Sequence, residues 1–139
     1  MSGIILVRDV MSRNVKTVRV NDTALDAVRK MNKFHIGSVI VTNNNRPVGI
    51  ITERNIMARI VEPRLDAGIV SAKDVMSSPL VTIDPNTAVE DAAKIMAQRV
   101  IKTLPVVEKE KVVGVLTSSD IVRTSPTQLR ILEELLRVG

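Results

Sequence analysis

The residues best suited to bind a ligand lie near the end of the chain, in the segment Gly114-Val115-Leu116-Thr117-Ser118-Ser119-Asp120. Thr117 falls where a predicted strand becomes a predicted helix, and the free N–H groups of a helix start suit a phosphate. Asp120 lies three residues further along the same helical face, where its carboxylate can accept hydrogen bonds. The structural alternative is that Thr117 caps the helix and Asp120 complements its dipole.

A matching segment occurs earlier in the chain as Gly49-Ile50-Ile51-Thr52-Glu53-Arg54-Asn55. Asn55 stands in the place of the acid, so any hydrogen bond it makes to a ligand lacks the assistance of a charge. Arg54 can offset this loss by reaching a phosphate, or it is an exposed helix charge without a ligand role.

These two segments belong to an internal repeat with a constant offset of 65 residues. Asp9-Val10-Met11-Ser12 returns as Asp74-Val75-Met76-Ser77, and matches continue from Thr17/Thr82 to Ile56/Ile121 without a gap. Such a register predicts two copies of one supersecondary unit. We expect a first repeat at 1–62, a linker at 63–71 and a second repeat at 72–124.

Each repeat has the pattern β-α-β-β-α, which predicts a mixed α/β (α+β) fold. In the first repeat the pattern predicts strands at 15–18, 38–42 and 48–52, and helices that follow Asp22 or Thr23 and span 53–60. Thr87 is the expected helix cap of the second repeat. One such unit is too small to bury a core alone, so we expect the two copies to pack together about a pseudo-twofold axis.

The last segment, 125–139, predicts an amphipathic helix. Ser125, Pro126 and Gln128 have the pattern of a capped helix start, and the apolar side consists of Leu129, Leu132, Leu135 and Leu136. Two roles for this apolar side remain open: it folds back onto the repeats, or it binds a partner.

Composition excludes several classes of chemistry. Of the 139 residues, 45% are apolar and Phe34 is the one aromatic, so the core must be aliphatic. Without cysteine, and with His35 as the one histidine, we expect no catalytic residues, no metal site and no enzymatic activity. The apolar run at 4–7 is too short for a signal peptide or a membrane span, which favours a cytoplasmic protein. The net charge of +5 favours anionic partners.

The repeated Asp-Val-Met-Ser start, the element order and the closing Gly-x-x-Thr-x-x-Asp/Asn segment together resemble the CBS-domain family, over about residues 7–61 and 72–124. The resemblance implies a tandem pair (a Bateman module) that binds AMP, ADP or ATP, or S-adenosylmethionine, in clefts between its repeats. It also implies a ribose-binding role for Asp120 and a homodimer of pairs.

The resemblance carries over to two sets of site residues. The second-repeat set ranks first, because it has Lys102 to meet phosphates and Pro105 to mark an edge or irregular strand; the corresponding first-repeat segment lacks both. The expected ligand-binding residues are Thr82, Ile83, Lys102, Thr103, Leu104, Pro105, Thr117, Ser118, Ser119 and Asp120 in the second repeat, and Thr17, Val18, Gly37, Ser38, Val39, Thr52, Arg54 and Asn55 in the first.

The sequence therefore predicts a regulatory, non-catalytic module that senses an adenine nucleotide, signals by a change of conformation and acts on a protein target that it does not name. Two alternatives remain. One is a protein-interaction scaffold whose ligand sites are vestigial. The other is a nucleic-acid binder that uses the positive charge, which a steep salt dependence of binding would reveal.

Overall fold

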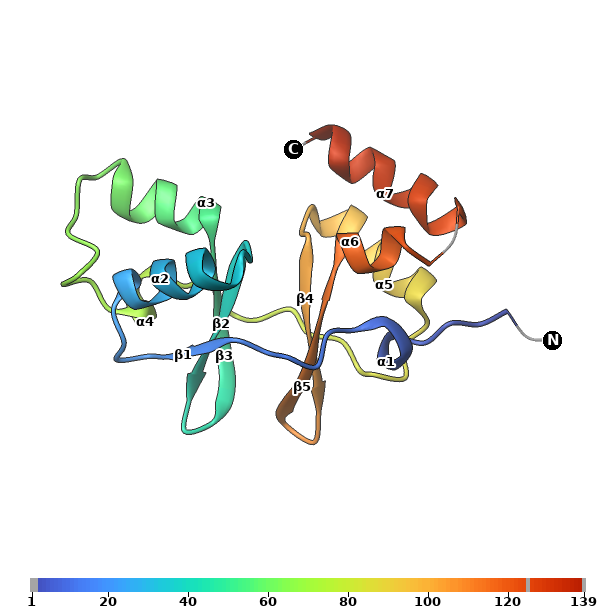
Figure 1. The fold of residues 1–139 in the computed structure, drawn as a ribbon, viewed down its shortest axis with the longest axis horizontal. Coiled ribbons are helices and arrows are strands. Elements are labelled where there is room, and N and C mark those ends of the chain that lie inside the picture. The colour runs from blue at the N-terminus through green and yellow to red at the C-terminus, as the bar shows by residue number, and fades with distance from the viewer. Residues whose placement is uncertain (1–2, 125, 139) are drawn as a thin grey trace. The chain divides into compact units, whose positions relative to one another are not determined.

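The computed structural model describes residues 3–124 and 126–138, and its contacts divide the chain into two compact units (Figure 1). Unit 1 comprises 1–15 together with 81–139, and unit 2 comprises 16–80. Each unit has its own core, formed by aliphatic side chains. The mixed α/β class with two repeats is thereby confirmed. No helix in the described part of the chain is long and apolar enough to cross a membrane.

Unit 2 contains a three-stranded sheet with helices packed against it. The central strand β2 pairs in parallel with β1 and antiparallel with β3. Buried side chains such as Val39 and Ile51 anchor the sheet in the core. The elements are β1 (Thr17–Arg19), α2 (Ala24–Phe34), β2 (Ser38–Asn43), β3 (Arg46–Thr52), α3 (Glu53–Ile56), the π-helix η1 (Met57–Val61) and α4 (Ala72–Val75).

Unit 1 has the same plan, displaced by 65 residues, with one more helix. Its elements are α1 (Val7–Val10), α5 (Val89–Arg99), β4 (Thr103–Glu108), β5 (Lys111–Thr117), α6 (Ser118–Val122) and α7 (Pro126–Val138). The bounds of α5, β4 and β5 equal those of α2, β2 and β3 plus 65. The repeat seen in the sequence is therefore a repeat of structure, element by element.

The first strand of the second repeat is reduced to a single bridge, in which Ile83 pairs with Val106. In unit 2, Ile40 donates its N–H to Lys16 and Val20 donates to Thr42. The equivalent positions in unit 1 are Pro105 and Pro85, which have no N–H to donate. The expected strand at Thr82-Ile83 is therefore wrong, although β4 lies at the sheet edge as Pro105 predicted.

Backbone conformation is also shared where residue types differ. The hairpin turns have positive φ at Asn44 and Asn45 (53° and 66°), and again at Lys109 and Glu110 (53° and 65°). Two consecutive positive φ values characterise the tight turns that asparagine accommodates well. The fold thus imposes on a Lys-Glu pair a turn that the first repeat makes with asparagines.

The opening segment of each repeat packs in the compact unit of the other repeat. Met11 lies against Gly114, where an added Cβ would come within 2.5 Å of the methionine sulfur. Met76 lies against Gly49 with the same 2.5 Å clearance. Both glycines therefore admit a neighbouring segment of chain.

The helix caps follow the offset rather than the residue types nearby. Thr23 caps α2, and its hydroxyl accepts from the N–H of Asp26 at 3.1 Å while the Asp26 carboxylate accepts from the N–H of Thr23 at 2.9 Å. The expected cap at Thr87 is wrong, because α5 begins one residue later, after Ala88, the equivalent of Thr23. No side chain caps α5; instead Val89 donates to the carbonyl of Ile5.

Helix α7 packs against α5 and α6, and this bears on one of the open alternatives. Leu132 and Leu135 are buried in the core of unit 1, so this part of the apolar side folds back onto the repeat. The expected contacts of Leu129 and Leu136 and the capping pattern at Ser125 and Gln128 lie outside what the structure describes.

Candidate functional site

Three segments of unit 1 that contain predicted site residues meet around the start of α6. Ser118 donates its N–H to the carbonyl of Lys102 at 2.9 Å, and Thr103 is the strand partner of Thr117. Ile83 donates to the carbonyl of Pro105 at 3.1 Å. The fold therefore brings the segments 82–83, 102–105 and 117–120 together within one unit.

Asp120 closes a reciprocal hydrogen-bond pair with the cap residue of α6. Its carboxylate accepts from the N–H of Thr117 at 2.9 Å, and its own N–H donates to the Thr117 hydroxyl at 3.2 Å. The second carboxylate oxygen lies 3.5 Å from the guanidinium of Arg123. The Asp120 side chain is 16% exposed and that of Arg123 is 75% exposed. Each carboxylate oxygen has two lone pairs, so capacity for hydroxyl donors remains.

The predicted site residues divide into side chains that face solvent and side chains that belong to the core. Thr82, Lys102 and Ser119 are exposed, so their side chains are accessible to a ligand. Ile83, Leu104, Pro105 and Ser118 are buried, and they can offer a ligand only backbone groups. The Lys102 ammonium has no ion-pair partner among the described residues.

The first-repeat residues also come together within one unit, and Asn55 repeats the geometry of Asp120. Its side-chain oxygen accepts from the N–H of Thr52 at 3.0 Å, and its N–H donates to the Thr52 hydroxyl at 3.2 Å. Its amide nitrogen, however, donates to the hydroxyl of Ser77 at 3.0 Å. Both ends of this amide are thus engaged inside unit 2.

The surroundings of this second cap differ in charge as well. A Cβ at Gly37 would lie 2.9 Å from a carboxylate oxygen of Glu53, so a negative group covers this backbone. The equivalent positions in unit 1 are Lys102 and Ser118. Val18 and Val39 are buried in the core of unit 2, whereas Thr17, Ser38 and Arg54 are at least partly accessible. An anionic ligand is favoured in unit 1 over this position.

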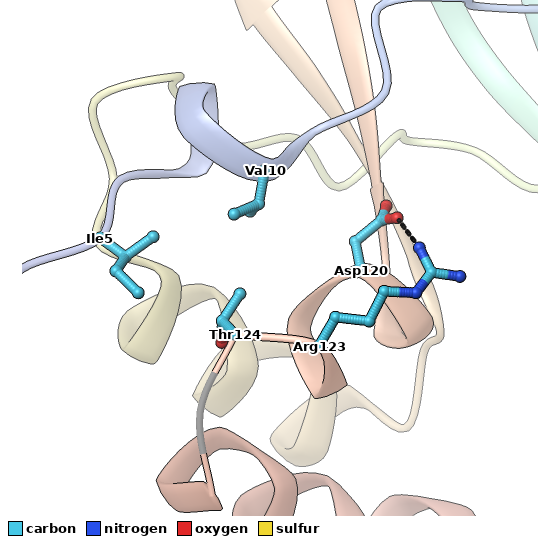
Figure 2. A pocket seen from close by; sticks show the side chains of 5 residues that line it. All are labelled: Ile5, Val10, Asp120, Arg123 and Thr124. Carbon is cyan, nitrogen blue, oxygen red and sulfur yellow. Dashed lines mark hydrogen bonds and ion pairs between the residues drawn. The ribbon is translucent and has the colours of Figure 1, made fainter.

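A pocket of about 300 Å³ opens beside Asp120, lined by Ile5, Val10, Arg123 and Thr124 (Figure 2). Arg123 and Thr124 follow Asp120 at the end of α6, and Ile5 and Val10 belong to the N-terminal segment. The sequence analysis identified Asp120 but missed the other four. The position of Arg123 three residues after Asp120 was a usable signal, whereas nothing in the sequence places Ile5 or Val10 there.

Comparison with known proteins identifies the class of protein. The model of the CBS domain family matches residues 7–62 and 72–126, so the chain belongs to this family as a tandem pair of CBS domains. CBS domains generally act as regulatory, ligand-binding modules.

Individual relatives agree with this assignment. An uncharacterized protein of Methanocaldococcus jannaschii is 44% identical over 128 residues, which are 92% of this chain and 66% of the relative. The CBS domain-containing protein YhcV of Bacillus subtilis is 34% identical over 83% of this chain and 81% of its own length. The chain thus spans about two thirds of the archaeal relative.

A solved structure shares the fold over nearly the whole chain. The conserved CBS domain protein TA0289 of unknown function from Thermoplasma acidophilum superposes with a TM-score of 0.86 at 28% identity. The match covers 98% of this chain and 78% of that one.

Proposed function

We propose that this chain is a non-catalytic regulatory module that binds an adenine nucleotide at the start of α6 in unit 1. The observation that carries the proposal is the Asp120 carboxylate, which is nearly buried, lies at the edge of a pocket and retains free lone pairs. A carboxylate so placed suits the paired hydroxyls of a ribose. Exposed Lys102, on a segment hydrogen-bonded to the same helix start, suits the phosphates.

Binding can be communicated through the N-terminal segment. Ile5 and Val10 line the same pocket as Asp120, and the chain continues from this segment directly into unit 2 at residue 16. A ligand that contacts Val10 therefore acts on a segment that both units share. This gives the module a covalent route from occupancy in unit 1 to a change in unit 2.

The alternative of a scaffold that binds partners through the C-terminal helix is less well supported. Leu132 and Leu135, the described leucines of that helix's apolar side, are already buried in unit 1. An interaction through this face would require the helix to detach from α5 and α6.

The test is calorimetric melting with AMP, ADP, ATP, S-adenosylmethionine and GTP. A ligand at about a hundred times its Kd adds about 2.7 kcal/mol to the free energy of unfolding. For a chain of this length we expect a rise of about 10 °C in Tm. Calorimetry suits the protein because it contains no Trp or Tyr and the nucleotides absorb ultraviolet light.

Three variants make the test specific. Asp120→Asn preserves the cap hydrogen bonds, as Asn55 demonstrates in the other repeat, and removes the charge. Asp120→Ala and Asn55→Ala both remove a cap partner, so they form a pair matched in stability loss. We expect the nucleotide response to vanish in both Asp120 variants and to persist in Asn55→Ala. Absence of a response to all five ligands in the wild type would overturn the proposal.

A further inference from the structure

Two lysine ammonium groups meet at the one aromatic ring of the chain, at the C-terminal end of α2. The Lys16 Nζ lies 4.0 Å from the centroid of the Phe34 ring, and the Lys33 Nζ lies 5.3 Å from it. Cations are attracted to an aromatic face, but like charges held this close also repel one another. The arrangement concentrates positive charge at a half-exposed aromatic side chain.

The helix dipole accounts for only part of this cluster. Lys33 is in the last turn of α2, where a positive charge is favoured. Lys16 is on a different segment, immediately before β1, and the dipole gives no reason for its placement. Lys30, also on α2, donates to the carbonyl of Thr17 and so lies beside the same segment.

Carboxylates of unit 2 do not neutralise the cluster. Asp26 lies close enough to Arg29 and Lys30 to feel their charges, but it sits in the first turn of α2, about 10 Å along the axis from Phe34. Lys33 forms no ion pair within the described ranges 3–124 and 126–138. Glu53, the acid nearest to the first-repeat cap, lies over Gly37.

The other repeat shows that the fold does not require this cluster. The residues equivalent to Lys16, Lys30, Lys33 and Phe34 are Val81, Ile95, Gln98 and Arg99. Helix α5 nevertheless has the same length as α2 and ends in the same left-handed conformation, with φ of 54° at Val100 and at His35.

The distribution of charge between the units points in the same direction. Unit 2 contains ten Lys and Arg residues against six Asp and Glu residues, so it holds a formal charge of +4 out of the +5 of the whole chain. Anionic ligands are therefore drawn toward unit 2 over distances up to the Debye length, about 10 Å at 0.1 M salt.

We infer that Lys16 and Lys33, held at the ring of Phe34, bind a di- or triphosphate chain. Lysine binds phosphate as a compact point charge, and a chain of several phosphates can contact both ammonium groups and relieve their repulsion. The phosphate chain belongs either to a nucleoside polyphosphate or to free polyphosphate. The site lies in unit 2, apart from Asp120, and does not depend on the nucleotide site proposed in unit 1.

The test combines titration calorimetry with amide chemical shifts from NMR, using tripolyphosphate, ATP and AMP. The double variant Lys16→Gln/Lys33→Gln removes the cluster. The double variant Lys73→Gln/Lys111→Gln removes the same charge from exposed positions elsewhere. All measurements are made in an Asp120→Asn background, so that loss of the proposed unit 1 site and loss of this one are separable.

We expect tripolyphosphate to shift the amides around Phe34 and its affinity to fall about tenfold in the cluster variant, the size of two surface ion pairs, with no change in the control variant. ATP competing with tripolyphosphate at these amides would identify a nucleotide tail as the source, and tripolyphosphate binding without ATP binding would identify the free chain. Equal losses in both double variants, or no shifts near Phe34, would overturn the inference.

Discussion

An alanine at position 114 would place its Cβ 2.5 Å from the sulfur of Met11 and 2.9 Å from the carbonyl oxygen of Ser12. The methionine side chain can move, but the carbonyl is fixed because Ser12 and Val115 exchange two hydrogen bonds of 2.9 Å. Relief of the second contact therefore requires part of this bridge to open. We expect Gly114→Ala to displace the N-terminal segment from β5.

The size of the effect follows from three terms. Overpacking of a tight site costs about 1–3 kcal/mol, and each strained backbone hydrogen bond adds up to about 1 kcal/mol. The lower entropy of an unfolded alanine returns about 0.4–1 kcal/mol. The net destabilisation is about 2 kcal/mol, which lowers Tm by about 6–10 °C for a chain of this size.

Calorimetric melting measures this change, and the structure supplies controls. Gly3→Ala meets nothing within 4 Å and should leave Tm unchanged. Gly49→Ala, with Met76 sulfur at 2.5 Å and the Ser77 carbonyl at 2.8 Å, should reproduce the loss in unit 2.

A double-mutant cycle tests the contact itself. Met11→Ala alone should cost about 2–5 kcal/mol, because the side chain is almost fully buried. In combination with Gly114→Ala the total should be smaller than the sum, because the cavity admits the new methyl group. Strict additivity, or an unchanged Tm for Gly114→Ala, would refute the packing argument.

Three further changes should each move stability in a definite direction. Val100→Gly should raise the free energy of unfolding by about 1 kcal/mol, because a β-branched residue is strained at φ of 54°; His35→Gly should gain less in the same calorimetric scan. Hydrogen bonds from Thr23 lower the pKa of Asp26, so its stabilising contribution is present above its unfolded pKa of about 4 and is lost as pH falls through the lower folded value. Carboxyl NMR titration should show this low pKa, and Thr23→Ala should raise it. Leu132→Ala should cost about 2–5 kcal/mol in urea unfolding followed by circular dichroism, because this side chain is fully buried under α7; a loss below 1 kcal/mol would contradict the packing of α7.

The elements of the fold were largely predictable because the repeat doubles every signal. Strand and helix patterns that are ambiguous once become reliable when they recur 65 residues later. The error at Thr87 shows the limit of reasoning from residue type, because the offset itself pointed to Ala88 as the equivalent of Thr23. The missing strand at Ile83 was also legible in principle, since Pro85 and Pro105 remove both flanking donors.

The site was predictable only where its residues are near one another in the sequence. Thr117 and Asp120 are separated by a single helical turn, so their proximity follows from the helix period. Ile5 and Val10 reach the same pocket through packing of the N-terminal segment in unit 1, and periodicity carries no information about that choice. The carboxylate of Glu53 over Gly37 is a tertiary contact of the same kind.

The comparison of Asp120 with Asn55 is the strongest physical argument that the second repeat binds a ligand. Both side chains accept from a cap N–H and complete the same hydrogen-bonded turn, at 2.9 and 3.0 Å, so the fold is served equally by a neutral amide. A charge on a side chain that is 16% exposed is costlier to desolvate than an amide. The dipole of a helix returns about 0.3–1 kcal/mol, and α6 has only five residues. Arg123, largely exposed at 3.5 Å, adds little. Folding therefore gives little reason for a carboxylate at position 120, whereas hydroxyl donors of a ligand in the adjoining pocket do.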